Sequence, residues 1–317
     1  MTTTTEAAVT AKPKPPQRPG DRWFSGTALA AGSMILVTLA AVAIFLIIQS
    51  IPGISATNET ASILRSDFWD YVWPLAFGTI WAALLALLMA VPLSVAVALF
   101  ISHYAPRRLA QTLGYIVDLL AAVPSVVFGL WGILVLAPAV LPVYMWLNTN
   151  MGWFPLFAGT VSGTGRTIFT AAIVLAVMIV PIITAICREI FLQTPVLHEE
   201  AALALGATRW EMIRMAVFPY GRSGIVSASM LGLGRALGET MAVAMVLSVA
   251  NVINIRLLTA ENPGTIPANI ALTFPEAYGT NINVLIATGL ILFIVTFAVN
   301  AVARWVVDRR KEFSGAN

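Results

Sequence analysis

The sequence predicts an all-α membrane protein with six transmembrane helices, and three observations support this fold class. Hydrophobic residues make up 59% of the 317 residues and charged residues only 10%, whereas a soluble domain carries about 25% charged residues. The apolar runs are long and continuous. They therefore predict helices rather than the alternating strands of a barrel, because lipid offers backbone groups no water. The basic residues gather on one side of the predicted spans.

Each predicted span holds about 20 mostly apolar residues, the length needed to cross a bilayer core. The six spans lie at 27–51, 75–101, 112–137, 167–187, 224–250 and 282–303. Pro92, Pro124 and Pro181 fall inside the second, third and fourth spans, where each removes a backbone hydrogen bond and bends its helix. A bent helix can line a cavity or can reflect irregular packing, and the sequence leaves both interpretations open.

The distribution of basic residues predicts the orientation of the chain. Only Arg65, Arg166 and Arg256 lie on one side of the spans, and Arg235 lies inside the fifth span. By the positive-inside rule, the opposite side is cytoplasmic, and both termini lie there. The basic residues on that side are Lys12, Lys14, Arg18, Arg22, Arg107, Arg108, Arg188, Arg209, Arg214, Arg222, Arg304, Arg309, Arg310 and Lys311.

The segments on the other side, 52–74, 138–166 and 251–281, are predicted to be outer loops. Several tryptophans lie near the predicted membrane interfaces, where such residues are typical of an aromatic belt that anchors the helices. Some of those in the outer loops could instead contact an external partner, and the sequence does not separate the two roles. The tryptophans are Trp69, Trp73, Trp146, Trp153 and Trp305.

Side chains suited to redox chemistry, metal binding or nucleotide hydrolysis are few. Cys187 is the only cysteine, which excludes an intrachain disulfide and a multi-cysteine metal site. The two histidines, His103 and His198, are too few and too far apart to suggest a metal site. All three lysines lie in the terminal tails, so none can serve the phosphate-binding loop of an ATPase. If ATP drives this protein, another polypeptide hydrolyses it.

The loop between the fourth and fifth spans is longer than a simple connection needs. It predicts a short helix over 198–205, which Gly206 terminates, and a second short helix that ends before Pro219. Thr208 is placed to cap the second helix, and Glu211 three residues later completes a capping box. The sequence therefore predicts two helices with a sharp bend at the cytoplasmic membrane surface.

These two helices could rest on lipid headgroups or dock on another protein. Lipid binding needs bulky apolar side chains on one helix face, and the first helix offers mainly small ones. Small side chains favour close approach by a groove of a partner. The small residues are Ala201, Ala202, Ala204, Gly206 and Ala207.

The same run resembles the EAA loop of ABC importer permeases, whose pattern is Glu-Ala-Ala, three residues, Gly, nine residues, Ile, one residue and Leu-Pro. Ala216 and Phe218 stand where that pattern has Ile and Leu, so both departures exchange one apolar residue for another. The resemblance implies that the short helix fits a groove on a separate ATPase subunit and transmits its closure to the membrane helices. The matching residues, expected to couple the chain to the ATPase, are Glu200, Ala201, Ala202, Gly206 and Pro219.

The fifth span carries a second informative segment, 231–243, which contains two charged residues. Arg235 and Glu239 are four residues apart, so they are expected to share one face of a continuous helix. A lone arginine at mid-membrane costs roughly 2.5–3.5 kcal/mol on insertion scales, and pairing with Glu239 would reduce this cost. The two form either a structural ion pair or part of an aqueous path for an anion, since a guanidinium is a planar fork of donors suited to phosphate oxygens.

The string Gly-Leu-Gly-Arg-Ala-Leu-Gly-Glu-Thr-Met-Ala in this segment resembles the phosphate-specific ABC importer permeases, and among them the PstC type. The run Val123-Pro124-Ser125, with Gly129 after it, is also similar to that family. The resemblance covers residues 75–305 and implies the type I ABC importer permease architecture. The substrate-pathway residues expected from the charged segment and from this resemblance are Arg235, Glu239, Thr240 and Ser125.

The resemblance also implies a complex in the bacterial plasma membrane. Its other members are a second, PstA-like permease, two PstB-like ATPase subunits and an external PstS-like phosphate-binding protein. ATP and Mg²⁺ bind to the ATPase, so this chain is expected to be no enzyme and to bind no cofactor, no metal and no nucleic acid. The expected segments are a disordered cytoplasmic arm (1–25), the first transmembrane helix with its outer loop (26–74), the type-1 permease domain (75–305, with the EAA loop at 195–219) and a cytoplasmic tail (306–317).

Other interpretations remain open. A PstA-type permease shares similar motifs, although the long outer loops and the N-terminal arm favour the PstC type. Charge alone does not separate phosphate from sulfate or another oxyanion. A standalone secondary transporter or channel is less favoured, because the sequence shows no internal repeat. An intramembrane enzyme is disfavoured, because Arg235, Glu239 and Asp118 supply no cluster of nucleophile, base or metal ligands.

Overall fold

A computed structural model describes residues 19–311 of the chain, which fall into two compact units. Residues 1–18 and 312–317 lie outside the described part, and with them most of the arm predicted at 1–25 and the end of the predicted tail. The described part of the first unit, 19–48, is one stretch of helix α1 (Pro19–Ile54), which begins inside the interval predicted as the arm. Large apolar side chains along α1 are exposed, and the helix is long and apolar enough to cross a membrane.

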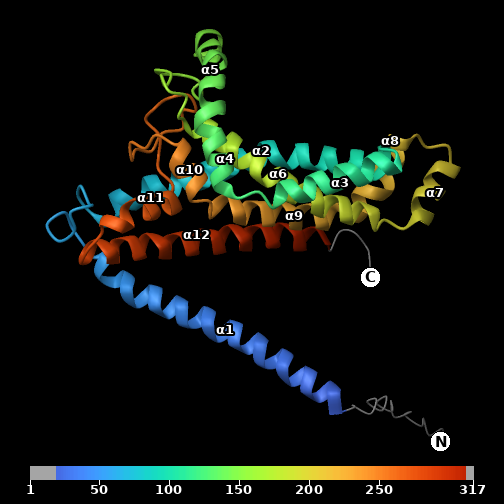
Figure 1. The fold of residues 1–317 in the computed structure, drawn as a ribbon, viewed down its shortest axis with the longest axis horizontal. Helices are drawn as coiled ribbons and strands as arrows, with labels where there is room; N and C mark the ends of the chain where they lie inside the picture. The colour runs from blue at the N-terminus through green and yellow to red at the C-terminus, as the bar shows by residue number, and fades with distance from the viewer. Residues whose placement is uncertain (1–18, 312–317) are drawn as a thin grey trace, which may run out of the picture. The chain divides into compact units, whose positions relative to one another are not determined.

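The second unit, from Gln49 onward, is helical throughout its described part, apart from connecting loops and isolated β-bridges (Figure 1). The all-α prediction is therefore confirmed. After α1, the elements are α2 (Phe68–Leu99), η1 (Phe100–Tyr104), α3 (Arg107–Ala121), α4 (Ser125–Trp131), η2 (Gly132–Leu136), α5 (Ala137–Met151), α6 (Ile168–Leu192), α7 (Val196–Ala204), α8 (Arg209–Met212), η3 (Ile213–Val217), α9 (Phe218–Leu237), α10 (Met241–Val246), α11 (Ile266–Thr273), η4 (Phe274–Glu276) and α12 (Thr280–Lys311).

Helix α6 is the centre of the second unit. It packs along α2 and α9, and about two thirds of the residues in its most apolar stretch are buried. Small residues permit this close packing: a Cβ added to Gly232 of α9 would lie 2.7 Å from Ile183 of α6. Hydroxyl groups also join the helices, since Ser94 of α2 donates to the carbonyl of Val180 at 3.2 Å. Such interhelical hydrogen bonds satisfy polar groups that lipid would leave unpaired.

The third span lies further along the chain than the sequence predicted. The predicted span at 112–137 is divided at Pro124, which adopts an extended conformation between α3 and α4. Proline disfavours the helical conformation in the residue before it, which explains the break. The membrane-length helix instead runs from Ser125 through α5 to Met151. It therefore takes up much of the predicted outer loop at 138–166, and Figure 1 shows α5 rising steeply from the packed helices.

The predicted fifth span, 224–250, is not one helix. Helix α9 ends at Leu237, the short α10 follows, and residues 247–265 form a loop. Two arginines, Arg222 and Arg235, and several glycines lower the apolar character of this region. Within residues 19–311, five helices are long and apolar enough to cross a membrane, and α9 is not among them. They are the helices at Trp23–Ile54, Phe68–Tyr104, Ser125–Met151, Ile168–Leu192 and Thr280–Trp305.

Candidate functional site

The loop that joins α6 to α9 was predicted to be cytoplasmic, and its first helix, α7, ends in a glycine motif. Gly206 has a φ of +86°, a left-handed conformation that glycine adopts without steric cost. Its amide donates to the carbonyl of Leu203 at 2.9 Å, and the amide of Ala207 donates to Ala202 at 3.2 Å. These two bonds form a Schellman motif, which satisfies carbonyls at a helix end. The prediction that Gly206 terminates this helix is confirmed.

The second helix of the loop begins with the predicted capping box. The Thr208 hydroxyl accepts a hydrogen bond from the Glu211 amide at 3.3 Å, and the Glu211 carboxylate accepts one from the Thr208 amide at 2.8 Å. Hydrogen bonds from the backbone and the side chain of Thr208 lower the pKa of Glu211, because they stabilise its charged form. The box fixes the direction in which the chain leaves the bend.

The prediction that this second helix ends before Pro219 is wrong. The helix continues from α8 through the π-helical turn η3 into α9, and Pro219 lies in the first turn of α9. Proline lacks an amide hydrogen and its ring crowds the carbonyl four residues earlier. A π-helical turn widens the backbone just before Pro219 and so accommodates it. The loop is therefore joined to α9 without an interruption.

The residues expected to contact an ATPase are mostly on the surface. Glu200, Ala201, Gly206 and Pro219 are exposed, while Ala202 is buried and fixes the inner face of α7. Large apolar side chains are exposed beside them, with Leu205 89% exposed. Helices α7 and α8 lie at one end of the second unit, away from α5 (Figure 1). An apolar surface with an acidic residue at the end of a helical bundle is suited to binding another protein.

The charged segment differs from its prediction. Arg235 and Glu239 do not share a helix face, because α9 ends at Leu237 and α10 begins at Met241. Glu239 is only 8% exposed and accepts a hydrogen bond from the amide of Ala242 at 3.1 Å, so it caps α10. Arg235 is exposed on α9. Among the side chains that the structure describes, the salt bridges present do not join the two residues.

The break between α9 and α10 lies beside the start of α4. Thr240 is half-buried there, and its hydroxyl donates to the carbonyl of Gly238 at 3.2 Å. Helix α4 packs against α10 so closely that a Cβ on Gly129 would lie 2.9 Å from the Cα of Ala242. Ser125 begins α4, about one helical turn before Gly129, and Glu239 and Thr240 lie in the break itself.

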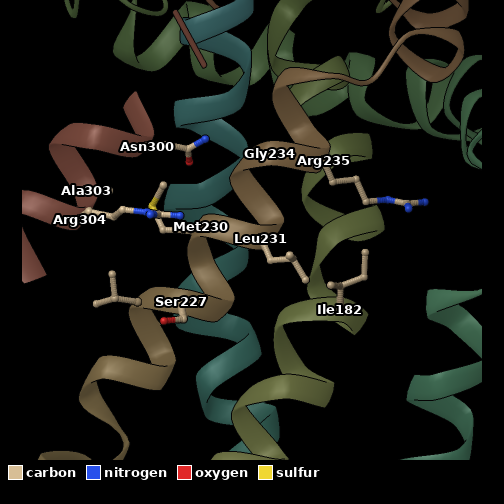
Figure 2. Close-up of a pocket in the computed structure, with 10 residues that line it drawn as sticks. Ile182, Ser227, Met230, Leu231, Gly234, Arg235, Asn300, Ala303 and Arg304 are labelled. Carbon is tan, nitrogen blue, oxygen red and sulfur yellow. The ribbon is translucent and has the colours of Figure 1, made fainter. Parts of the chain in front are cut away.

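Arg235 faces a different environment, an open groove of about 880 Å³. The groove lies along α9 between α6 and α12, and Arg304 of α12 also lines it (Figure 2). In Figure 2 the Arg304 side chain extends from α12 toward α9, while the Arg235 guanidinium extends from α9 away from α12, so positive charge is present at two separate places. The remaining lining residues are Ile182, Val226, Ser227, Met230, Leu231, Gly234, Asn300 and Ala303.

Sequence patterns did not identify two charged contacts near the loop that joins α6 to α9. Asp118 of α3 lies 3.7 Å from Arg188 of α6. The Arg188 guanidinium lies against Gly114, and a Cβ there would come within 2.3 Å of it, so the arginine side chain would have to shift. A second contact, between His103 and Glu199, joins residues far apart in the sequence. Periodicity cannot detect such pairs, since each depends on how helices pack.

Comparison with protein families finds one match that covers most of the chain. Residues 90–312 match the family described as "Binding-protein-dependent transport system inner membrane component". The matched range contains the loop that joins α6 to α9, the α9–α10 break and the groove residues described above.

Individual relatives match over nearly the full length. The "Phosphate transport system permease protein PstC 2" of Mycobacterium tuberculosis is 47% identical, with 95% of each chain covered. The "Phosphate transport system permease protein PstC" of Mesorhizobium japonicum is 40% identical, covering 93% of this chain and 92% of the relative. Among solved structures, a bacterial ABC transporter involved in the import of alginate is 17% identical with a TM-score of 0.58, over 90% of this chain and 96% of that one. This last similarity supports the fold alone.

Proposed function

The chain belongs to the family of binding-protein-dependent transport system inner membrane components, and from this premise we propose that it imports inorganic phosphate as a PstC-type permease subunit. Proteins of this family are the membrane component of a transporter and not its catalyst. The phosphate assignment rests on one observation, the 47% identity to a phosphate permease over 95% of the chain. A PstA-type subunit or a permease for another oxyanion is the alternative.

The charged residues near the α9–α10 break are proposed to line the substrate path. Backbone that is not helical at membrane depth is tolerated where it is buried in protein or lines a water-filled cavity. Arg235 is exposed and carries donors in a planar fork, which suits phosphate oxygens. Glu239 holds the start of α10 and opposes tight trapping of an anion. The hydroxyl of Ser125 is a hydrogen-bond donor for the anion, and that of Thr240 becomes one when it leaves the carbonyl of Gly238.

The loop from 195 to 219 is proposed to couple this chain to an ATPase. Its first helix, α7, presents Glu200 and Ala201 on the surface, and its second helix is continuous with α9. A movement of the loop can therefore reach α9 and Arg235 through one helical segment. ATP binding to the two ATPase subunits would close them and open the path outward, and hydrolysis would reset it. ATP and Mg²⁺ bind to those partner subunits.

We also infer the membrane arrangement. Helix α9 is 20 residues long, or about 30 Å, which is sufficient to cross a bilayer core. With the five apolar helices it makes six crossings, as in type I importers, so both termini lie on one side of the membrane. The basic residues on that side make it the cytoplasmic one. The proposed segments remain the first helix with its outer loop at 26–74, the permease domain at 75–305 and the tail at 306–317. An external phosphate-binding protein would dock on the outer loops, and a PstA-like permease would complete the path.

The proposal is tested by transport in proteoliposomes that hold the complete complex. Labelled phosphate and labelled sulfate are supplied with the external binding protein, with ATP inside, and complexes with and without this chain are compared. The expected result is ATP-dependent phosphate uptake that requires this chain. Uptake of sulfate in preference to phosphate would reassign the substrate. Uptake that follows an ion gradient without the ATPase subunits would overturn the proposal.

A further inference from the structure

Helix α7 is tied to the membrane helices by a side-chain contact outside its own loop. Nε2 of His103 lies 3.4 Å from the Glu199 carboxylate, across a separation of 96 residues in the sequence. His103 belongs to η1, the π-helical end of α2, and Glu199 belongs to α7. The two side chains are only 9% and 21% exposed. The contact is therefore shielded from water, which strengthens its electrostatic attraction.

The histidine ring is held in place from its other side. The Ser102 hydroxyl lies 2.7 Å from Nδ1 of His103 and 2.8 Å from the carbonyl of Ala98. Nε2 can donate to Glu199 either from the protonated ring or from one tautomer of the neutral ring. The ring is thus held against the backbone of α2 through Ser102. A displacement of Glu199 therefore pulls on the end of α2, because the histidine ring cannot rotate freely to follow it.

The backbone of α7 packs mainly against α8 and η3, which follow it in the same loop. Among the polar contacts that the structure records for residues 193–219, the contact with His103 is the one that reaches α2. A distance of 3.4 Å is at the long end for an N–H···O contact. A small movement of α7 toward α2 shortens the contact, and a movement away breaks it. The pair can therefore respond to the position of α7.

We infer that His103 and Glu199 form a positioning link through which movement of the coupling helix α7 reaches the membrane helix α2. This role rests on the proposed function, because it assigns a path for the force that a partner ATPase exerts on α7. It adds a second route beside the continuous helix from α8 to α9. Helix α6 packs against both α2 and α9. The link would therefore let α2 and α9 move together when the ATPase closes.

The test uses the complete reconstituted transporter and the variants His103→Gln, Glu199→Gln and the double variant. Each single variant is expected to move about tenfold less phosphate per ATP hydrolysed, while the complex assembles in wild-type amounts. The double variant is expected to fall no further than the single ones, because all three lose the same contact. Glu189→Gln is the matched control, since Glu189 lies on α6 outside the loop at 195–219 and its side chain is 59% exposed, and it should behave as wild type.

A second measurement does not depend on the substrate. Hydrogen exchange is followed with and without a non-hydrolysable ATP analogue, which closes the ATPase. In the wild-type complex, exchange should change in α7 and at the end of α2, and in Glu199→Gln it should change in α7 alone. An equal response of α2 in both proteins, or additive losses in the double variant, would overturn the link. Absence of phosphate uptake by the wild-type complex would instead overturn the proposed function and leave this exchange test valid.

Discussion

The loop that joins α6 to α9 and the charged segment after it are neighbours in the sequence, but different interactions determine their structures. In the loop, the glycine stop at Gly206 and the capping box of Thr208 and Glu211 formed as their residue types predict. In the charged segment, the expected helical pairing of Arg235 with Glu239 did not form, because the helix breaks between them. Short-range hydrogen bonds determine the conformation of the loop, whereas the packing of helices distant in the sequence determines the conformation of the charged segment.

The largest effect is expected from Arg235, the charge that the break leaves exposed. Arg235→Ala should lower phosphate uptake by the reconstituted complex by about 100-fold or more, because hydrogen bonds to a charged group are lost. Arg235→Lys should retain part of the uptake, since a lysine keeps the charge but not the planar fork.

Leu231→Ala is the matched control for Arg235, because it lies one turn earlier in the same groove and carries no charge. It should transport phosphate at close to the wild-type rate. Normal uptake by a fully assembled Arg235→Ala complex would remove this residue from the mechanism and would make the break a structural feature only.

The second effect concerns the packing of α4 against α10, next to the break between α9 and α10. Gly129→Ala should lower the free energy of unfolding by about 1–3 kcal/mol through overpacking, because the added Cβ meets the backbone of Ala242 and the sulfur of Met245 at 2.9 Å. Gly234→Ala should have the opposite sign, since open space surrounds that position and alanine favours helix by about 1 kcal/mol over glycine. Thermal unfolding of the purified chain measures both, and equal shifts would contradict the proposed tight α4–α10 contact.

A smaller effect is expected at the loop glycine. Gly206→Ala should destabilise the bend by roughly 1–2 kcal/mol, because a side chain at positive φ crowds the following carbonyl. Phosphate uptake should fall several-fold while the rest of the chain stays folded. Gly163→Ala is the control, since that glycine also lies in open space but without a positive φ. Wild-type coupling in Gly206→Ala would show that the ATPase tolerates a different bend.

The smallest effect is a dependence on pH at the capping box. The folded-state pKa of Glu211 is lowered by its hydrogen bonds with Thr208, so the charged form stabilises the loop. This stability is complete above the unfolded pKa of the carboxyl group and is lost as the pH falls through the folded pKa. The protection factors of the amides of α8, which correct for the slower intrinsic exchange in acid, should therefore fall as the pH is lowered. Glu211→Gln should remove this dependence, and an unchanged pH profile in that variant would exclude Glu211 as its source.

Much of the fold followed from the sequence because the relevant signals are local. Apolar runs of sufficient length predicted the helices, and the spans around 75–101 and 167–187 lie within α2 with η1 and within α6. The third span was displaced because Pro124 separates α3 from α4, while the π-helical turn η2 carries the helix on into the predicted outer loop. Proline position is visible in a sequence, but whether a helix bends, breaks or widens at it depends on its neighbours.

By itself, the sequence determined a helical membrane protein and the caps of the loop that joins α6 to α9, because these depend on composition and on bonds that reach three or four residues. Only the tertiary structure decided that Glu239 caps α10, that Arg235 faces a groove with Arg304, and that His103 reaches Glu199. The last two depend on how close two helices approach, whereas the cap is a local bond that forms because α9 ends before Glu239. Glycines such as Gly129 and Gly232 permit that approach, but a glycine does not specify which helix will lie against it.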